Sequence, residues 1–197
     1  MSSRSVLASA AVAAAMIATV GPAASHDDDH GGRRGRRLRA DLKGLREVPV
    51  VSSSGQGSFR AVINDDETQI TYRLDYAALE GTVTQAHIHV GAHHTNGGIS
   101  VWLCGTTGIP TPPGTPGPVG TPTCGAPGGP EAEAEGVITA ANVVGPVAQG
   151  IGGPTPVVDP DAEFAQLIKM LRSGLGYANV HTTMSPSGEI RGQIRVD

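Results

Sequence analysis

Residues 57–79 read GSFRAVINDDETQITYRLDYAAL, and apolar residues alternate with polar ones on both sides of a central turn. The apolar residues that share a side are Phe59, Ala61 and Ile63 in the first half and Ile70, Tyr72, Leu74 and Tyr76 in the second. Alternation with a period of two is typical of a strand with one buried face. The intervening NDDET suits a hairpin turn. This stretch therefore predicts two antiparallel strands over one core.

Short extended segments with turn punctuation continue on both sides of this hairpin. They are RLRADLKGLREVP (37–49), VTQAHIHV (83–90), ISVWLC (99–104), EAEGVI (133–138) and a closing hairpin of YANVHTTM (177–184) and GEIRGQIRV (188–196). Seven or eight short strands predict an all-β fold, either an antiparallel sandwich or a Greek-key barrel.

One segment, DPDAEFAQLIKMLRSG (159–174), has a different period. Its apolar residues Phe164, Leu167, Ile168 and Leu171 fall at helical spacing. Asp159 or Asp161 can cap its start, and Gly174 can end it. We expect one amphipathic helix near the C-terminus, packed on the β core.

The first residues predict export. Residues 1–25 combine a basic start at Arg4 with the apolar run VLASAAVAAAMIATV and a small-residue exit, which is the pattern of a secretory signal peptide. Residues 26–37, beginning HDDDHGGRRGRR, carry clustered charge and predict a flexible tail before a domain at 38–197. No later run is apolar enough to span a bilayer once the signal is removed. We expect a secreted protein, either extracellular or in the cell envelope.

The two cysteines, Cys104 and Cys124, predict a disulfide, because an even pair in an oxidising compartment is most simply bonded. They bracket a segment rich in proline and glycine, so we expect a disulfide-closed surface loop over 105–130. Two free reactive thiols are the alternative. The formal net charge of −4 argues against a nucleic-acid partner.

Several motifs occur in a fixed order along the chain: LKGLREVPVV (42–51), AHIHVG (86–91), TNGG (95–98), NVHT (179–182) and GEIRGQI (188–194). In this order they resemble the CHRD domain, a chordin-type domain found in secreted bacterial proteins, over about residues 38–196. The resemblance implies an extracellular all-β domain without a settled biochemical activity. The Pro/Gly insert and the extra histidines His93 and His94 depart from shorter bacterial versions.

Three histidines form the candidate metal site. His87 and His89 lie two apart on a predicted strand, so they share a face at about 6 to 7 Å. His181 occupies a matching polar position in NVHT, and the three imidazoles meet if the two strands are neighbours. Copper and zinc both suit such a set of nitrogens. Glu189 is a candidate fourth ligand or outer partner of an imidazole.

The alternative is that His87 and His89 face water and hydrogen-bond across the sheet while Ile88 and Val90 face the core. His93 and His94 are adjacent and are interpreted as turn residues. Cleavage after Ala23 would create a second copper site at residues 24–26, ending in His26. In the last strand, Glu189, Arg191, Gln193 and Arg195 share a face, which we interpret as solvated and held by cross-strand pairs.

Three functions follow from these patterns. The first is a secreted CHRD-like binding module that holds copper or zinc, with an extracellular protein as a further partner. The second is an oxidoreductase similar to copper–zinc superoxide dismutase, although that family's zinc loop and glycine-rich signature are missing here. The third is a structural extracellular interaction protein without metal. The sequence shows no nucleophile with an evident base and no phosphate-binding glycine loop, so we assign no catalytic residue.

Overall fold

The computed structural model describes residues 36–106, 117–125, 131–152 and 159–197. The strands are β1 (Arg37–Lys43), β2 (Gln56–Ile63), β3 (Ile70–Ala77), β4 (Val83–Val90), β5 (Gly98–Gly105), β6 (Glu131–Ile138), β7 (Gly176–Thr182), β8 (Ile190–Gln193) and β9 (Arg195–Val196). Three 3₁₀ turns, η1 (Gly44–Arg46), η2 (Ala140–Asn142) and η3 (Val147–Gln149), and the helix α2 (Pro160–Arg172) complete the described elements. The predicted signal peptide, nearly all of the charged tail and the site at residues 24–26 lie outside the described residues.

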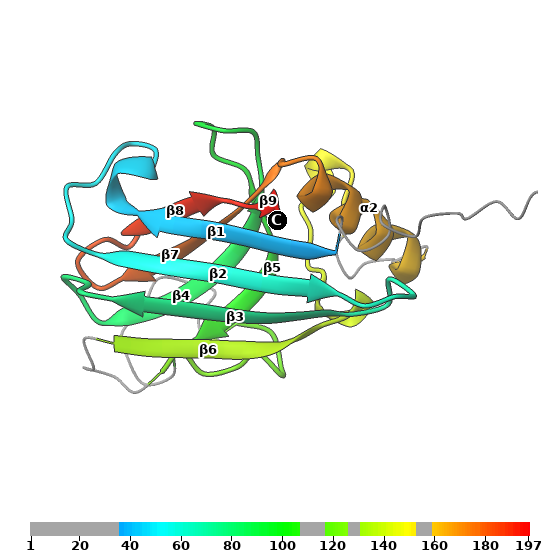
Figure 1. The fold of residues 1–197 in the computed structure, drawn as a ribbon, viewed down its shortest axis with the longest axis horizontal. Coiled ribbons are helices and arrows are strands. Elements are labelled where there is room, and N and C mark those ends of the chain that lie inside the picture. The colour runs from blue at the N-terminus through cyan, green and yellow to red at the C-terminus, as the bar shows by residue number, and fades with distance from the viewer. Residues whose placement is uncertain (1–35, 107–116, 126–130, 153–158) are drawn as a thin grey trace, which may run out of the picture.

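The strands form one antiparallel sheet in the order β5-β4-β7-β8-β1-β2-β3-β6, with β9 also paired to β1. The sheet curls into a nearly closed barrel, with β1, β2, β3 and β6 on one side and β4, β5 and β7 behind them (Figure 1). Across the interior, the hydroxyl of Tyr72 on β3 donates to the carbonyl of Leu103 on β5 at 2.6 Å. The predicted all-β fold is confirmed in its barrel form. The described chain has nine strands, one more than the highest count expected, because β9 is a separate two-residue pairing.

The alternating residues fill the barrel interior as predicted. Phe59, Ile63, Ile70 and Leu74 are fully buried. The hairpin pairs β2 with β3 in register from Gln56 opposite Ala77 to Ile63 opposite Ile70. The first strand begins at Arg37, the last residue that the sequence assigns to the tail.

The helix α2 lies over one end of the barrel (Figure 1). The Asp159 side chain accepts hydrogen bonds from the backbone N–H groups of Asp161 and Ala162, both at 3.1 Å, so Asp159 is the N-cap. Gly174, with φ +69°, follows its last turn. The predicted apolar face, Phe164, Leu167, Ile168 and Leu171, is buried. In the described parts of the chain, no helix is long and apolar enough to cross a membrane.

The predicted disulfide joins Cys104 at the end of β5 to Cys124. Both sulfur-bearing residues are fully buried. Gly105 and Thr123 form a parallel bridge beside the disulfide, which fixes residues 117–125 against β5. The rest of the predicted loop, 107–116 and 126–130, lies outside the described residues.

Candidate metal centre

The site is built on the outer wall of the barrel, where β4 and β7 run side by side. On β4, His87 pairs with Asn179 of β7, and His89 pairs with Tyr177. His181 lies two residues beyond Asn179 and therefore points to the same face. Ala86, Ile88, Ala178 and Val180 point into the barrel core. The prediction that the two strands are neighbours is thus confirmed, and their pairing brings the three imidazoles together.

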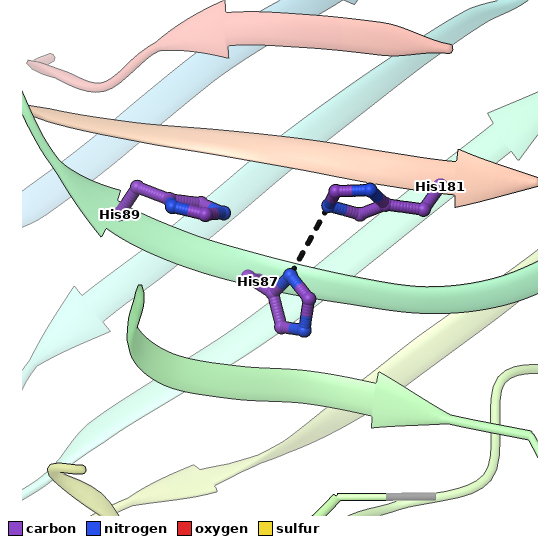
Figure 2. Close-up of side chains that lie close together, drawn as sticks. All are labelled: His87, His89 and His181. Atoms are coloured by element: carbon purple, nitrogen blue, oxygen red, sulfur yellow. Dashed lines mark hydrogen bonds between the residues drawn. The ribbon is translucent and has the colours of Figure 1, made fainter. Parts of the chain in front are cut away.

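The three rings converge on a common point (Figure 2). The Nδ1 atom of His87 lies 3.2 Å from the Nε2 atom of His181. One ligand nitrogen from each of His87, His89 and His181 lies within 4.8 Å of the other two. Two nitrogens bound to one tetrahedral zinc ion at 2.0 to 2.1 Å would be about 3.3 Å apart. The His87–His181 pair therefore has the spacing of two ligands of a shared ion, and the nitrogen of His89 lies within 4.8 Å of both.

This outer face is closed to solvent. His87, His89 and His181 are 0%, 8% and 7% exposed. Trp102 of β5 packs its ring edge-on against His87 at 4.3 Å. The backbone carbonyls of Gly97 and Pro186 approach from loops on either side of the strands. The alternative is therefore wrong in exposing His87 and His89 to water, because covering loops bury the second face of β4, whereas its placement of Ile88 and Val90 in the core is confirmed.

The surrounding carbonyls fix where two of the imidazoles carry their protons. His89 Nδ1–H donates to the carbonyl of Gly97 at 3.0 Å, and His181 Nδ1–H donates to the carbonyl of Pro186 at 2.9 Å. A carbonyl oxygen only accepts, so the Nε2 atoms of both neutral rings present lone pairs. The Nε2 atoms of His87 and His89 are buried without a hydrogen-bond partner. Buried polar atoms of this kind are rare, and a bound ion is one explanation.

Burial also keeps the three imidazoles uncharged. Desolvation lowers the pKa of His87 to about 2 and that of His89 to about 4, and it lowers the pKa of His181 as well. The neighbouring histidines lower the pKa values of His87 and His89 further. A neutral imidazole is the form that binds a metal ion.

Asn179 is a member of the site that the sequence reasoning missed. Its Oδ1 atom lies 3.0 Å from His181 Nε2, and its side chain hydrogen-bonds to the carboxyl of Glu47. Because a carboxylate accepts, the amide N–H₂ faces Glu47 and Oδ1 faces the imidazole. Two lone-pair atoms therefore face each other in a buried space. The available signal was the position of Asn179, two residues before His181 on the same strand face.

A second set of contacts holds the wall around the histidines. The Tyr177 ring stacks on the His89 ring, with centroids 4.8 Å apart. The guanidinium carbon of Arg191 lies 3.4 Å from the Tyr177 centroid. Arg191 also donates to the carbonyl of Thr95 at 2.7 Å and to Oδ1 of Asn96 at 3.2 Å. The loop that supplies Gly97 is thereby tied to β8.

The interpretation of the last strand as a solvated face is wrong for two residues. Glu189 and Arg191 are 0% and 2% exposed, whereas Arg195 is exposed as expected. Glu189 accepts from the Ser53 hydroxyl, the Glu80 backbone N–H and the Thr182 hydroxyl. These hydrogen bonds connect Glu189 to two loops and to the end of β7. Within the described chain, none of the hydrogen bonds of Glu189 involves an imidazole.

His93 and His94 lie in the predicted turn after β4 and are exposed. They pack edge-on against each other at 3.9 Å. Neither belongs to the group formed by His87, His89 and His181. His94 has φ +63°, a turn conformation outside any strand.

Comparison with known proteins supports the predicted resemblance. The family model described as the CHRD domain matches residues 38–194, which is most of the chain and covers the described strands from the second residue of β1 to the end of β8. No curated protein and no solved structure matches the chain. The chain belongs to the CHRD domain family.

Proposed function

We propose that this protein is an extracellular binding module whose barrel wall holds one zinc or copper ion through His87, His89 and His181. The observation that carries the proposal is that one buried nitrogen of each imidazole lies within 4.8 Å of the other two, with His87 Nδ1 hydrogen-bonded to His181 Nε2 at 3.2 Å. The Nε2 atoms of His87 and His89 lack partners, and Asn179 Oδ1 faces His181 Nε2. A proton on His181 would satisfy that last contact, but burial opposes the charged ring.

A metal ion at the point of convergence would bind Nδ1 of His87, the Nε2 atoms of His89 and His181, and Asn179 Oδ1, whereas Nε2 of His87 points away from this point (Figure 2). Three imidazole nitrogens and one amide oxygen form a donor set that suits Zn²⁺ or Cu²⁺. The carbonyls of Gly97 and Pro186 hold two rings in the orientation that aims Nε2 inward, as outer partners of metal-bound histidines commonly do. Asn179, held by Glu47, is the proposed fourth donor, and Glu189 supports the loops from outside.

In this proposal the protein binds the ion, and the bound ion stabilises the fold. A catalytic metal site keeps an open position for substrate, whereas a structural site is closed by protein ligands. The histidines here are at most 8% exposed, so the geometry favours a closed site over a superoxide dismutase-like reaction. The disulfide and the CHRD family support an extracellular location.

Metal analysis of the full-length exported protein tests this function. We expect about one equivalent of zinc or copper to be bound in competition with a chelator. The variant His87→Asn/His181→Asn should lose that equivalent. The matched control His93→Asn/His94→Asn removes the same number of histidines from the exposed turn and should retain it. Equal metal content in the two double variants, with native circular dichroism in both, would contradict the proposal.

A further inference from the structure

A row of arginines crosses the side of the barrel that lies opposite the candidate metal centre. The pairing register sets Arg195 of β9 opposite Arg39 of β1, Arg39 opposite Arg60 of β2, and Arg60 opposite Arg73 of β3. We call these four residues the arginine row. All four are exposed, and the strands that carry three of them, β1, β2 and β3, lie side by side in Figure 1.

The row works against the stability of the sheet. Like charges directly opposite each other on neighbouring strands are destabilising. Asp197 pairs with Arg39 at 2.9 Å, and Arg73 pairs with Asp75 at 2.9 Å and also with Glu133. Arg60 and Arg195 make no ion pair within the described chain. A sheet face that keeps two arginines of such a row, Arg60 and Arg195, without an ion pair in the described chain has the character of a binding surface.

Hollows in the surface continue along the row. One, of about 110 Å³, is lined by Arg39, Arg46, Arg195 and His93, with Asp41 as its acidic member. A second, of about 480 Å³, is lined by Arg37, Arg39, Arg60 and Arg73, with Glu135 and Asp197 as its acidic members. Arg39 belongs to both. The cationic side chains therefore border a continuous path rather than a single spot.

We propose that the arginine row binds a sulfated polysaccharide. Adjacent strands are about 4.8 Å apart, so the four guanidinium positions extend over about 14 Å in a line, which suits a linear polyanion. The planar fork of arginine matches the oxygen atoms of a sulfate group with two parallel hydrogen bonds. Because Asp75, Glu133 and Asp197 already pair with two of the arginines, the ligand must have a high charge density to displace them.

Other polyanions fit this face less well. Single-stranded nucleic acid binds through aromatic side chains on which bases stack, and no Phe, Tyr or Trp side chain is exposed in the described chain. The chain as a whole is acidic, with a net charge of −4, which weakens long-range attraction to duplex DNA. An acidic protein would need apolar or aromatic anchors near the row, and Val62 is the one exposed large apolar residue that lines these two hollows.

Affinity measurements with dextran sulfate, using uncharged dextran of equal length as the reference, test this proposal on the full-length protein. We expect binding to dextran sulfate alone. Arg60→Ala/Arg195→Ala should weaken binding at least about 10-fold. It should also reduce the slope of log affinity against log salt concentration by about two, one for each arginine removed. Arg60→Lys/Arg195→Lys should weaken binding several-fold, because lysine keeps the charge and loses the fork.

The control Lys169→Ala/Arg172→Ala removes two positive charges from α2 and should change binding less than twofold. Because the arginine substitutions remove like-charge repulsion, the urea midpoint of the alanine variant should be unchanged or higher, which excludes unfolding as the cause. Equal losses in the α2 control, or no loss in either arginine variant, would overturn the proposal. Equal or tighter binding to polyuronate or duplex DNA would overturn the assigned ligand class.

Discussion

The imidazole of His89 and the phenol ring of Tyr177 lie parallel, with their planes 3° apart and their centroids separated by 4.8 Å. Tyr177 in turn contacts the guanidinium of Arg191, which bonds to the loop at Thr95 and Asn96. The orientation of His89 therefore depends on a stack that begins on β8. This stack links the stability of the domain to the geometry of the metal centre.

Replacing Arg191 tests that link. Arg191→Ala removes two hydrogen bonds from a charged donor and a buried cation–π contact, so we expect the free energy of unfolding to fall by about 3 kcal/mol or more. Arg191→Lys should fall between this variant and the native protein, because lysine lacks the fork. Urea unfolding of the metal-free proteins measures both. The exposed Arg195→Ala should change the free energy of unfolding by less than about 0.5 kcal/mol.

Trp102 is the single tryptophan of the chain, and its ring lies 4.3 Å from that of His87. We therefore expect Cu²⁺ bound at the site to quench the fluorescence of the protein strongly, because a paramagnetic ion next to the indole provides a path for non-radiative decay. Zn²⁺, which has a filled d shell, should compete with Cu²⁺ and restore the emission. Quenching of equal size in His87→Asn/His181→Asn would place the copper elsewhere.

Asn179 should contribute to metal affinity without being required for folding. Asn179→Ala removes the proposed oxygen donor, so we expect zinc affinity to fall about 10- to 100-fold, the range observed when groups around a metal site are lost. Isothermal titration in the presence of a competing chelator measures the change. Asn64→Ala, in the exposed turn between β2 and β3, is the matched amide control and should leave the affinity unchanged.

The stability of the metal-free protein should depend on pH through the buried histidines. Their pKa values are lowered by burial, to about 2 for His87 and about 4 for His89. Below pH 6.5 the unfolded chain therefore binds protons that the folded chain does not, and stability falls as pH falls. Each such histidine contributes about 1.4 kcal/mol per pH unit in this window.

Glu47 opposes this slope. Burial raises its pKa to about 7, so between pH 4.5 and 7 the folded chain holds a proton that the unfolded chain has lost. His87 and His89 outweigh Glu47, so we expect a net loss of about 1 kcal/mol or more per pH unit as pH falls from about 6 to 5, and the lowered pKa of His181 adds to that loss. Glu47→Gln should steepen the slope, because it removes the group that opposes the histidines. A profile that is flat from pH 7 to pH 5 would show that the histidines are not buried in the neutral form.

The strands, the helix and the disulfide could be predicted because each depends on a local signal. Alternation at Phe59 to Ile63 decides which side chains enter the core, and Asp159 marks the helix start. The pairing of the cysteines required only that they be alone in an oxidising compartment. The convergence of His87, His89 and His181 followed from the shared face of each strand and the assumption that the strands are neighbours.

The closure of the outer face could not be predicted from alternation. The pattern assigns His87, Arg191 and Glu189 to the face away from the core, and such a face is usually exposed. Here Trp102 and the loops carrying Gly97 and Pro186 cover it, and those contacts join segments far apart in the sequence. Asn179 was missed for the same reason, since a lone asparagine on a strand gains meaning only when its neighbours are placed around it.

The most direct test is a crystal structure of the zinc- or copper-loaded protein with anomalous diffraction recorded on both sides of the metal absorption edge. We expect one strong anomalous peak bonded to His87, His89 and His181, at about 2.0 to 2.1 Å from a nitrogen of each ring. A fully loaded crystal with no peak among these three rings, or with its peak at His93, His94 or the N-terminal histidines, would contradict the proposed site.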